Sequence, residues 1–181
     1  MVSSEQLILP RAAAAAVQRA CEVVPVVVVL GARQTGKTTL VRSHPTLAGR
    51  PYLTLDDFDL RSQAQADPEA MLLRAPQLTL DEVQRARDLL IAVKRAVDAD
   101  STRQKGRFVL TGSANLLMLE RVSETLAGRS VYVTLWPFTR RERLGLGCTV
   151  FAYQRTLARN QRPLHYMGRS LRRDRYAVLS S

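Results

Sequence analysis

A short stretch of the chain matches the pattern G-x-x-x-x-G-K-T, whose residue types suit it to surround a chain of phosphates. The glycines permit backbone angles and close approach that a side chain would block, so backbone N–H groups can wrap the phosphates. The lysine is expected to reach the β and γ phosphates, and the final threonine hydroxyl to ligate Mg²⁺. We therefore predict that ATP with Mg²⁺ is bound by Gly31, Ala32, Arg33, Gln34, Thr35, Gly36, Lys37, Thr38 and Thr39. The alternative interpretation is a turn between a strand and a helix, with a solvated lysine.

Two adjacent acids, Asp81 and Glu82, follow the apolar run Leu78–Leu80. An aspartate at the end of a buried strand can hold Mg²⁺, together with Thr38, and a neighbouring glutamate can polarise an attacking water. The same acids could instead cap a helix that begins near Val83. Beside the glycine-rich loop, the pair favours hydrolysis of ATP over transfer of its phosphate to a small molecule.

A third polar cluster, Thr111, Ser113 and Asn115, follows another apolar run. In many sheets of this kind such a strand lies next to the strand that carries the phosphate loop. We predict that one of these three polar side chains orients the attacking water or senses the γ phosphate. Ser113 or Asn115 could instead serve as an ordinary helix N-cap.

Arg129 stands just past a predicted helix end, after Gly128, which suits a helix C-terminal cap. It is a candidate arginine finger that would contact the phosphate of a neighbouring subunit, which implies a homo-oligomer. It could equally interact with the negative end of the helix dipole. With Lys37, Glu82, Ser113 and Asn115, it completes the set of candidate catalytic residues.

The elements that must position these residues alternate along the chain. Val26–Leu30 is apolar without alternation, as in a strand buried on both faces of a sheet. Further strands are predicted at 52–55, 78–80, 107–111 and 131–135, and helices at 11–21, 38–42, 67–74, 89–97 and 116–126. The pattern predicts an α/β fold in which a parallel five-stranded sheet is flanked by helices. The ligand site would lie at the carboxyl ends of its strands.

The 181 residues, 46% of them apolar, suffice for one globular core. We expect a domain over 1–147 and a poorly ordered, arginine-rich tail over 148–181, because the last segment lacks a sustained apolar period. The net charge is +11, and residues 151–181 hold seven arginines against one acid, Asp174. Such a tail could bind nucleic acid or an acidic partner, although no nucleic-acid motif is visible.

Cys21 and Cys148 lie far apart, and the start of the chain does not resemble a secretory leader. The longest strongly apolar run, Val23–Leu30, contains Pro25 and is too short to span a bilayer. These features predict a soluble cytoplasmic protein that does not contact a membrane.

Four strings, at 30–40, 80–86, 110–115 and 126–129, resemble the prokaryotic AAA-type ATPase family that joins an N-terminal ATPase domain to a C-terminal domain of unknown function. The resemblance implies the additional-strand class of P-loop fold and ATP hydrolysis. It also implies phosphate, magnesium, water-activating, sensor and arginine-finger roles for Lys37, Thr38 with Asp81, Glu82, Ser113 or Asn115, and Arg129. The likeness ends near Gly147, which would suit a truncated or frameshifted member of the family.

We therefore expect an AAA-type ATPase that hydrolyses ATP with Mg²⁺ and acts on a target that the sequence does not identify. One alternative is a nucleotide-binding remnant or switch with little hydrolysis. The other is a basic protein that binds nucleic acid through its tail.

Overall fold

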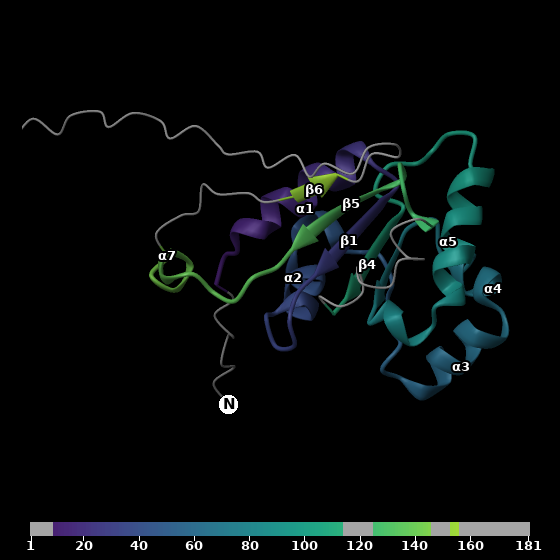
Figure 1. Ribbon diagram of the computed structural model, residues 1–181, viewed down its shortest axis with the longest axis horizontal. Helices are drawn as coiled ribbons and strands as arrows, with labels where there is room; N and C mark the ends of the chain where they lie inside the picture. The colour runs from purple at the N-terminus through teal and green to yellow at the C-terminus, as the bar shows by residue number, and fades with distance from the viewer. Residues whose placement is uncertain (1–8, 114–124, 146–152, 156–181) are drawn as a thin grey trace, which may run out of the picture.

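A six-stranded sheet forms the centre of the computed structural model, which describes residues 9–113, 125–145 and 153–155 (Figure 1). Its order is β2-β3-β4-β1-β5-β6. The first five strands of this order are parallel, and β6 pairs antiparallel with β5. The strands are β1 (Val26–Leu30), β2 (Tyr52–Thr54), β3 (Leu78–Asp81), β4 (Phe108–Gly112), β5 (Ser130–Thr134) and β6 (Tyr153–Arg155). The predicted parallel five-stranded sheet is confirmed, and β4 stands between β1 and β3 as the additional-strand class requires.

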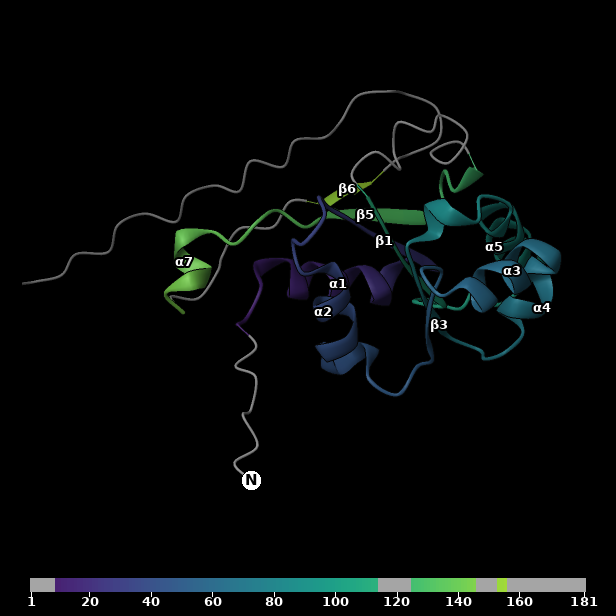
Figure 2. The same cartoon turned by 90° about the horizontal axis from the view of Figure 1, so that it is seen from below.

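Helices cover both faces of the sheet (Figures 1 and 2). One face carries α1 (Ala12–Val23) and α2 (Lys37–Ser43), which pack in one apolar cluster with Val27 and Val29 of β1. The other carries α3 (Phe58–Ala66), α4 (Pro68–Leu72) and α5 (Asp88–Ala99), in a cluster with Val26, Val28 and Leu30. Alternate side chains of β1 thus enter opposite cores, which explains its unbroken apolar run.

Local sequence signals predicted α4 but not α3. Asp67 accepts a hydrogen bond from the backbone N–H of Ala70 at 2.9 Å and caps α4, with Pro68 at the first helical position. The helix α3 was not predicted, because Ala64 is its one buried residue and it therefore has no apolar period. Within the described ranges, no helix combines the length and apolar character needed to cross a bilayer.

Two elements that follow β5 in the chain were not predicted from the sequence. A short helix, α7 (Arg140–Arg143), begins at Thr139, and Thr139 and Glu142 form a reciprocal capping box. The strand β6 lies inside 148–181, the segment that the sequence analysis expects to be a poorly ordered tail. The remainder of that segment, and most of the predicted helix 116–126, lie outside the described residues. In the described part of the chain, two 3₁₀ turns accompany these elements, at Pro45–Leu47 and Val83–Arg85.

Candidate functional site

The two glycines of the phosphate-loop pattern each meet a geometric requirement. The loop joins β1 directly to α2. A Cβ added to Gly31 would lie 2.5 Å from the carbonyl oxygen of Leu135 and 2.8 Å from the Thr35 hydroxyl. Gly36 has a φ of +88°, a backbone conformation that side chains disfavour. The turn therefore depends on glycine at both positions.

Lys37 is buried beneath the loop, with 6% of its surface exposed. Its Nζ donates hydrogen bonds to the carbonyl oxygens of Gly31 and Ala32, each at 3.1 Å. Thr35 is also buried and donates from its hydroxyl to the Ala32 carbonyl at 2.9 Å. The exposed side chains of the predicted set are Ala32, Arg33, Gln34, Thr38 and Thr39. The lysine charge is thus held inside the loop and not in solvent.

Asp81 ends β3 and collects hydroxyl donors from three other elements, although only 3% of its surface is exposed. Thr38 of α2 donates to its carboxylate at 3.2 Å, and Tyr52 of β2 and Thr111 of β4 donate to it as well. Burial, together with the neighbouring carboxylate of Asp81, raises the pKa of Tyr52 to about 12, so this hydroxyl keeps its proton. Among the described residues, the hydrogen-bond donors to the Asp81 carboxylate are side-chain hydroxyls, which does not support its interpretation as a helix cap.

Glu82 adopts a left-handed backbone conformation, with φ of +57°. Its backbone N–H donates to the Thr111 hydroxyl at 3.2 Å, and its carboxylate accepts from the side-chain amide of Gln84. Glu82 stands at the N-cap position of the 3₁₀ turn at Val83–Arg85 but makes no side-chain capping bond there. Thr111 therefore contacts both acids, since it donates to Asp81 and accepts from Glu82.

Of the predicted polar cluster Thr111, Ser113 and Asn115, the structure brings Thr111, in β4, to this site. Ser113 is half-buried at the edge of the described chain, and Asn115 lies outside the described residues. The family resemblance implies Ser113 or Asn115 as the sensor, and this role stays a prediction. Tyr52 was not predicted as a site residue, because an aromatic residue in a predicted strand is typical of packing. The pairing of β2 with β3 brings it beside Asp81.

Arg129 lies away from the phosphate loop of its own chain. β1 and β5 are parallel with Val26 opposite Ser130, so Arg129 lies at the amino ends of the strands while the loop follows their carboxyl ends. Its guanidinium pairs with Asp98 of α5 and also donates to the Ala127 carbonyl at 2.9 Å. The hydrogen bond from Arg129 lowers the pKa of Asp98. Within one chain, Arg129 therefore lies apart from the candidate catalytic residues Lys37 and Glu82.

A hollow of about 550 Å³ adjoins the loop. It lies between the segment before α1, the first turns of α2 and the chain after β5, and its lining includes Pro10, Gly36, Thr39, His44 and Phe138. Burial lowers the pKa of His44, which favours the neutral imidazole. The hollow is thus continuous with the phosphate loop and offers apolar and polar surface, to which Arg11 adds a positive charge.

Comparison with protein families decides the relationship of the chain. A family model described as AAA domain matches residues 24–144. This range begins just before β1 and ends just after α7. The chain belongs to the AAA domain family. The predicted AAA-type P-loop family is therefore confirmed, and the matched range contains the loop, both acids and Arg129.

Two curated relatives of this AAA domain are uncharacterized proteins of Mycobacterium tuberculosis and Mycobacterium bovis. Each is 39% identical to it over 140 residues, which is 75% of this chain. The chain spans 30% of the length of these relatives.

Two solved structures share the fold of this AAA domain. One is a DNA replication initiation factor, with 19% identity and a TM-score of 0.52 over 74% of this chain and 46% of that one. The other is a Walker-type ATPase of Pyrococcus abyssi, with 16% identity and a TM-score of 0.50 over 75% of this chain and 55% of that one. At these identities the likeness concerns the fold alone.

Proposed function

We propose that this AAA domain binds ATP with Mg²⁺ and hydrolyses it to ADP and phosphate. The observation that carries the proposal is the 3.2 Å hydrogen bond between the Thr38 hydroxyl and the Asp81 carboxylate. These residues are 43 positions apart, on α2 and at the end of β3. The fold thus brings a hydroxyl and a carboxylate together beside a loop suited to phosphates.

The donor set fits magnesium. Mg²⁺ prefers oxygen ligands and is usually bound by one or two carboxylates, water and substrate phosphates, without a full protein cage. Among the described residues no group of three or more histidine, cysteine or acidic side chains could form such a cage. Thr38 and Asp81 would therefore hold the ion, which when bound neutralises charge on the β and γ phosphates.

Lys37 and the loop would bind the triphosphate. The two carbonyl bonds of the Lys37 Nζ hold its charge within the loop, where it would contact the β and γ phosphates. Backbone N–H groups at the start of α2 would supply further donors. The adjoining hollow, with Thr39 and Pro10 in its lining, would receive the adenine base.

Glu82 would act as the general base. It would accept a proton from a water molecule whose oxygen attacks the γ phosphorus, while the bond to the β-γ bridging oxygen breaks and ADP leaves. Thr111 supports this role, because it fixes the Glu82 backbone and the Asp81 carboxylate relative to each other. We also propose Ser113 or Asn115 as sensor, and Arg129 as a finger toward a neighbouring copy.

A phosphate-release assay with ATP and Mg²⁺, combined with calorimetric titration of ATP, tests the proposal. The wild type should bind ATP and release phosphate. Lys37→Ala should severely weaken binding, because it removes the charge that the loop encloses. The exposed Lys105, before β4, offers a matched control, and Lys105→Ala should behave as the wild type. Equal ATP affinity in wild type and Lys37→Ala would contradict the assignment of the loop.

One observation favours a second candidate, a nucleotide-binding switch with little hydrolysis. The Glu82 carboxylate is hydrogen-bonded to Gln84, which would compete with a water molecule for the base. The same two measurements separate the candidates, since a switch would bind ATP and release no phosphate. Binding of nucleic acid or an acidic partner through 148–181 remains a prediction from sequence.

A further inference from the structure

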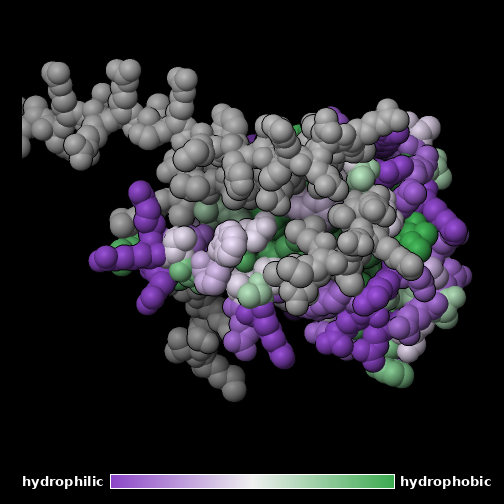
Figure 3. All heavy atoms as spheres, in the orientation of Figure 1, coloured by the Kyte–Doolittle hydropathy of each residue, from purple (hydrophilic) through white to green (hydrophobic). Residues whose placement is uncertain are grey.

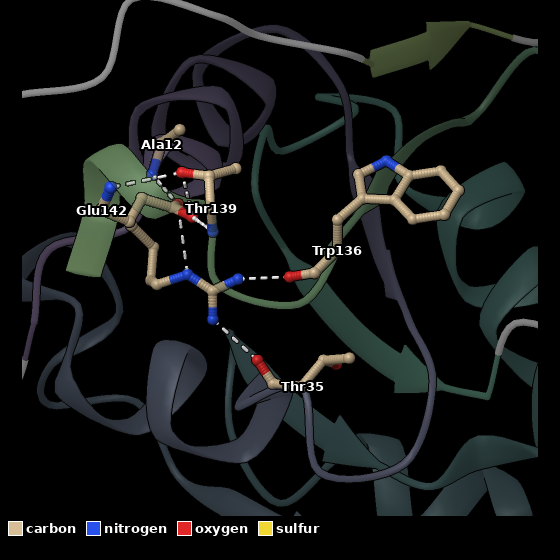
Figure 4. Close-up of polar contacts among 6 residues, drawn as sticks. Ala12, Thr35, Trp136, Thr139 and Glu142 are labelled. Atoms are coloured by element: carbon tan, nitrogen blue, oxygen red, sulfur yellow. Dashed lines mark hydrogen bonds and ion pairs between the residues drawn. The ribbon is translucent and has the colours of Figure 1, made fainter.

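Arg11, the residue before α1, connects the phosphate loop to the chain that follows β5. Its Nη1 donates to the backbone carbonyl of Thr35 in the loop at 2.7 Å, and its Nη2 donates to the carbonyl of Trp136. Its Nε donates to the carboxylate of Glu142 in α7 at 3.3 Å. Figure 4 shows Thr35, Trp136 and Glu142 around this guanidinium, with the Trp136 ring directed away from it. Each of the three guanidinium nitrogens of Arg11 therefore donates a hydrogen bond.

The anchor for Arg11 is itself fixed on several sides. The side chains of Arg11 and Glu142 are 7% and 4% exposed. Glu142 also accepts from the backbone N–H of Ala12 at 2.9 Å and from that of Thr139 at 2.8 Å. The guanidinium lies over the ring of Phe138, with its carbon 4.0 Å from the ring centre. The arginine thus has one conformation in which all its bonds are made.

The bond to Thr35 acts on the peptide that precedes Gly36. A peptide group is planar and trans, so holding the Thr35 carbonyl on one side directs the Gly36 N–H to the other. Arg11 also lies against Gly36, since a Cβ at this position would be 3.3 Å from its Nη1. Gly36 needs a positive φ, and this conformation directs the chain into α2. Arg11 therefore constrains the orientation of the Thr35–Gly36 peptide, whose N–H belongs to the phosphate loop.

We propose that Arg11 is a positioning residue for the phosphate loop, with Glu142 as its anchor. It holds the Thr35–Gly36 peptide in the orientation that binds phosphate, without contacting the phosphates itself. The inference rests on the proposed nucleotide binding. The conformation of the loop would then depend on the position of the segment Trp136–Glu142, because that segment supplies two of the three acceptors of Arg11.

The variant Arg11→Lys keeps the charge and loses the fork of donors, which a lysine cannot reproduce. We expect it to bind ATP·Mg²⁺ and inorganic tripolyphosphate each about tenfold more weakly in calorimetry, as for the loss of one hydrogen bond to a charged group. Arg107→Lys is the matched control. Arg107 donates to the Ala96 carbonyl at 2.8 Å and pairs with Asp100, before the amino end of β4. This control should lower the melting temperature and leave both affinities unchanged.

The outcomes separate the two proposals. If wild type binds neither ligand, the proposed function fails and this inference fails with it. If wild type binds both and Arg11→Lys melts lower with unchanged affinities, Arg11 is structural only and the inference is overturned. Loss of ATP affinity with unchanged tripolyphosphate affinity would overturn it too, since Arg11 would then contact the nucleoside. Should Arg11→Lys not fold, Glu142→Gln weakens the same anchor and must lower tripolyphosphate affinity severalfold, and unchanged affinity there overturns the inference.

Discussion

Arg129 and Asp98 form a two-point ion pair, in which Nε and Nη2 donate to the two carboxylate oxygens at 2.5 Å and 2.9 Å. The pair joins the start of β5 to the last turns of α5, at the amino ends of the strands. Any contact of Arg129 with a neighbouring copy must therefore replace or share the bond to Asp98.

A comparison of Arg129→Ala with Asp98→Ala separates the finger role from the structural one. Both variants lose the same partly exposed pair, which is worth at most about 1 kcal/mol, so both should melt slightly lower. Arg129→Ala should melt somewhat lower than Asp98→Ala, because it also loses the bond to the Ala127 carbonyl. If Arg129 acts on a neighbour, only Arg129→Ala should lose phosphate release, and ATP affinity should be retained. Equal release by the two variants would leave Arg129 a purely structural role.

Glu82→Gln should retain ATP affinity and lose turnover by about 100-fold or more, because an amide cannot accept the proton of the attacking water. Single-turnover phosphate release and ATP titration measure the two effects separately. Glu69, exposed on α4, supplies the control variant Glu69→Gln, which should turn over like the wild type. Undiminished turnover in Glu82→Gln would remove this residue from the mechanism.

Thr111→Val keeps the shape of the side chain and removes the hydroxyl that joins Asp81 to the Glu82 backbone. We expect stability to fall by about 1–3 kcal/mol, because a buried carboxylate loses a donor. Phosphate release should fall about tenfold or more, while Thr111→Ser restores most of it. Chemical denaturation and the release assay provide the readouts. A Thr111→Ser variant as impaired as Thr111→Val would contradict the hydroxyl role.

The pH dependence of folding tests Glu142. Burial works against its ionisation, but hydrogen bonds from Thr139 and Ala12 and the charge of Arg11 prevail, so the pKa of Glu142 lies below its ordinary value of 4.5. Its stabilising contribution is then fully present above pH 4.5 and is lost as the pH falls through the folded-state pKa.

The melting temperatures of wild type and Glu142→Gln should therefore differ by a constant amount at about pH 7 and down to pH 4.5, and converge below it. Other carboxylates with lowered pKa, such as Asp98, titrate equally in both proteins and cancel in the difference. A difference that widens on acidification would contradict the assignment.

The sequence was most informative where one residue type has few structural roles. Gly31, Gly36 and Lys37 were predicted from their spacing to bind phosphates, which stays a prediction. The structure shows a close approach of backbone at Gly31, a positive φ at Gly36 and a lysine hydrogen-bonded inside the loop. The unbroken apolar run of β1 likewise predicted a strand covered on both faces.

Contacts between distant segments were beyond that reasoning. Tyr52 reaches Asp81 only because β2 pairs with β3, and nothing in its local sequence distinguishes it from a packing residue. Arg11 and Glu142 are 131 positions apart and look like ordinary helix-end charges. Their burial together depends on the whole sheet, so periodicity and capping signals could not predict it.

The described sheet ends on each side in a strand of only three residues, β2 and β6. Short edge strands give other chains little backbone to pair with, and so protect against edge-to-edge aggregation. The neighbour of β6 in the sheet is β5. The centre of β5 is Val131, Tyr132 and Val133, a run with high strand propensity and no charge. Removal of the chain from residue 153 onward would expose the backbone of this run, and such a protein should aggregate more readily on storage even where its fold is retained.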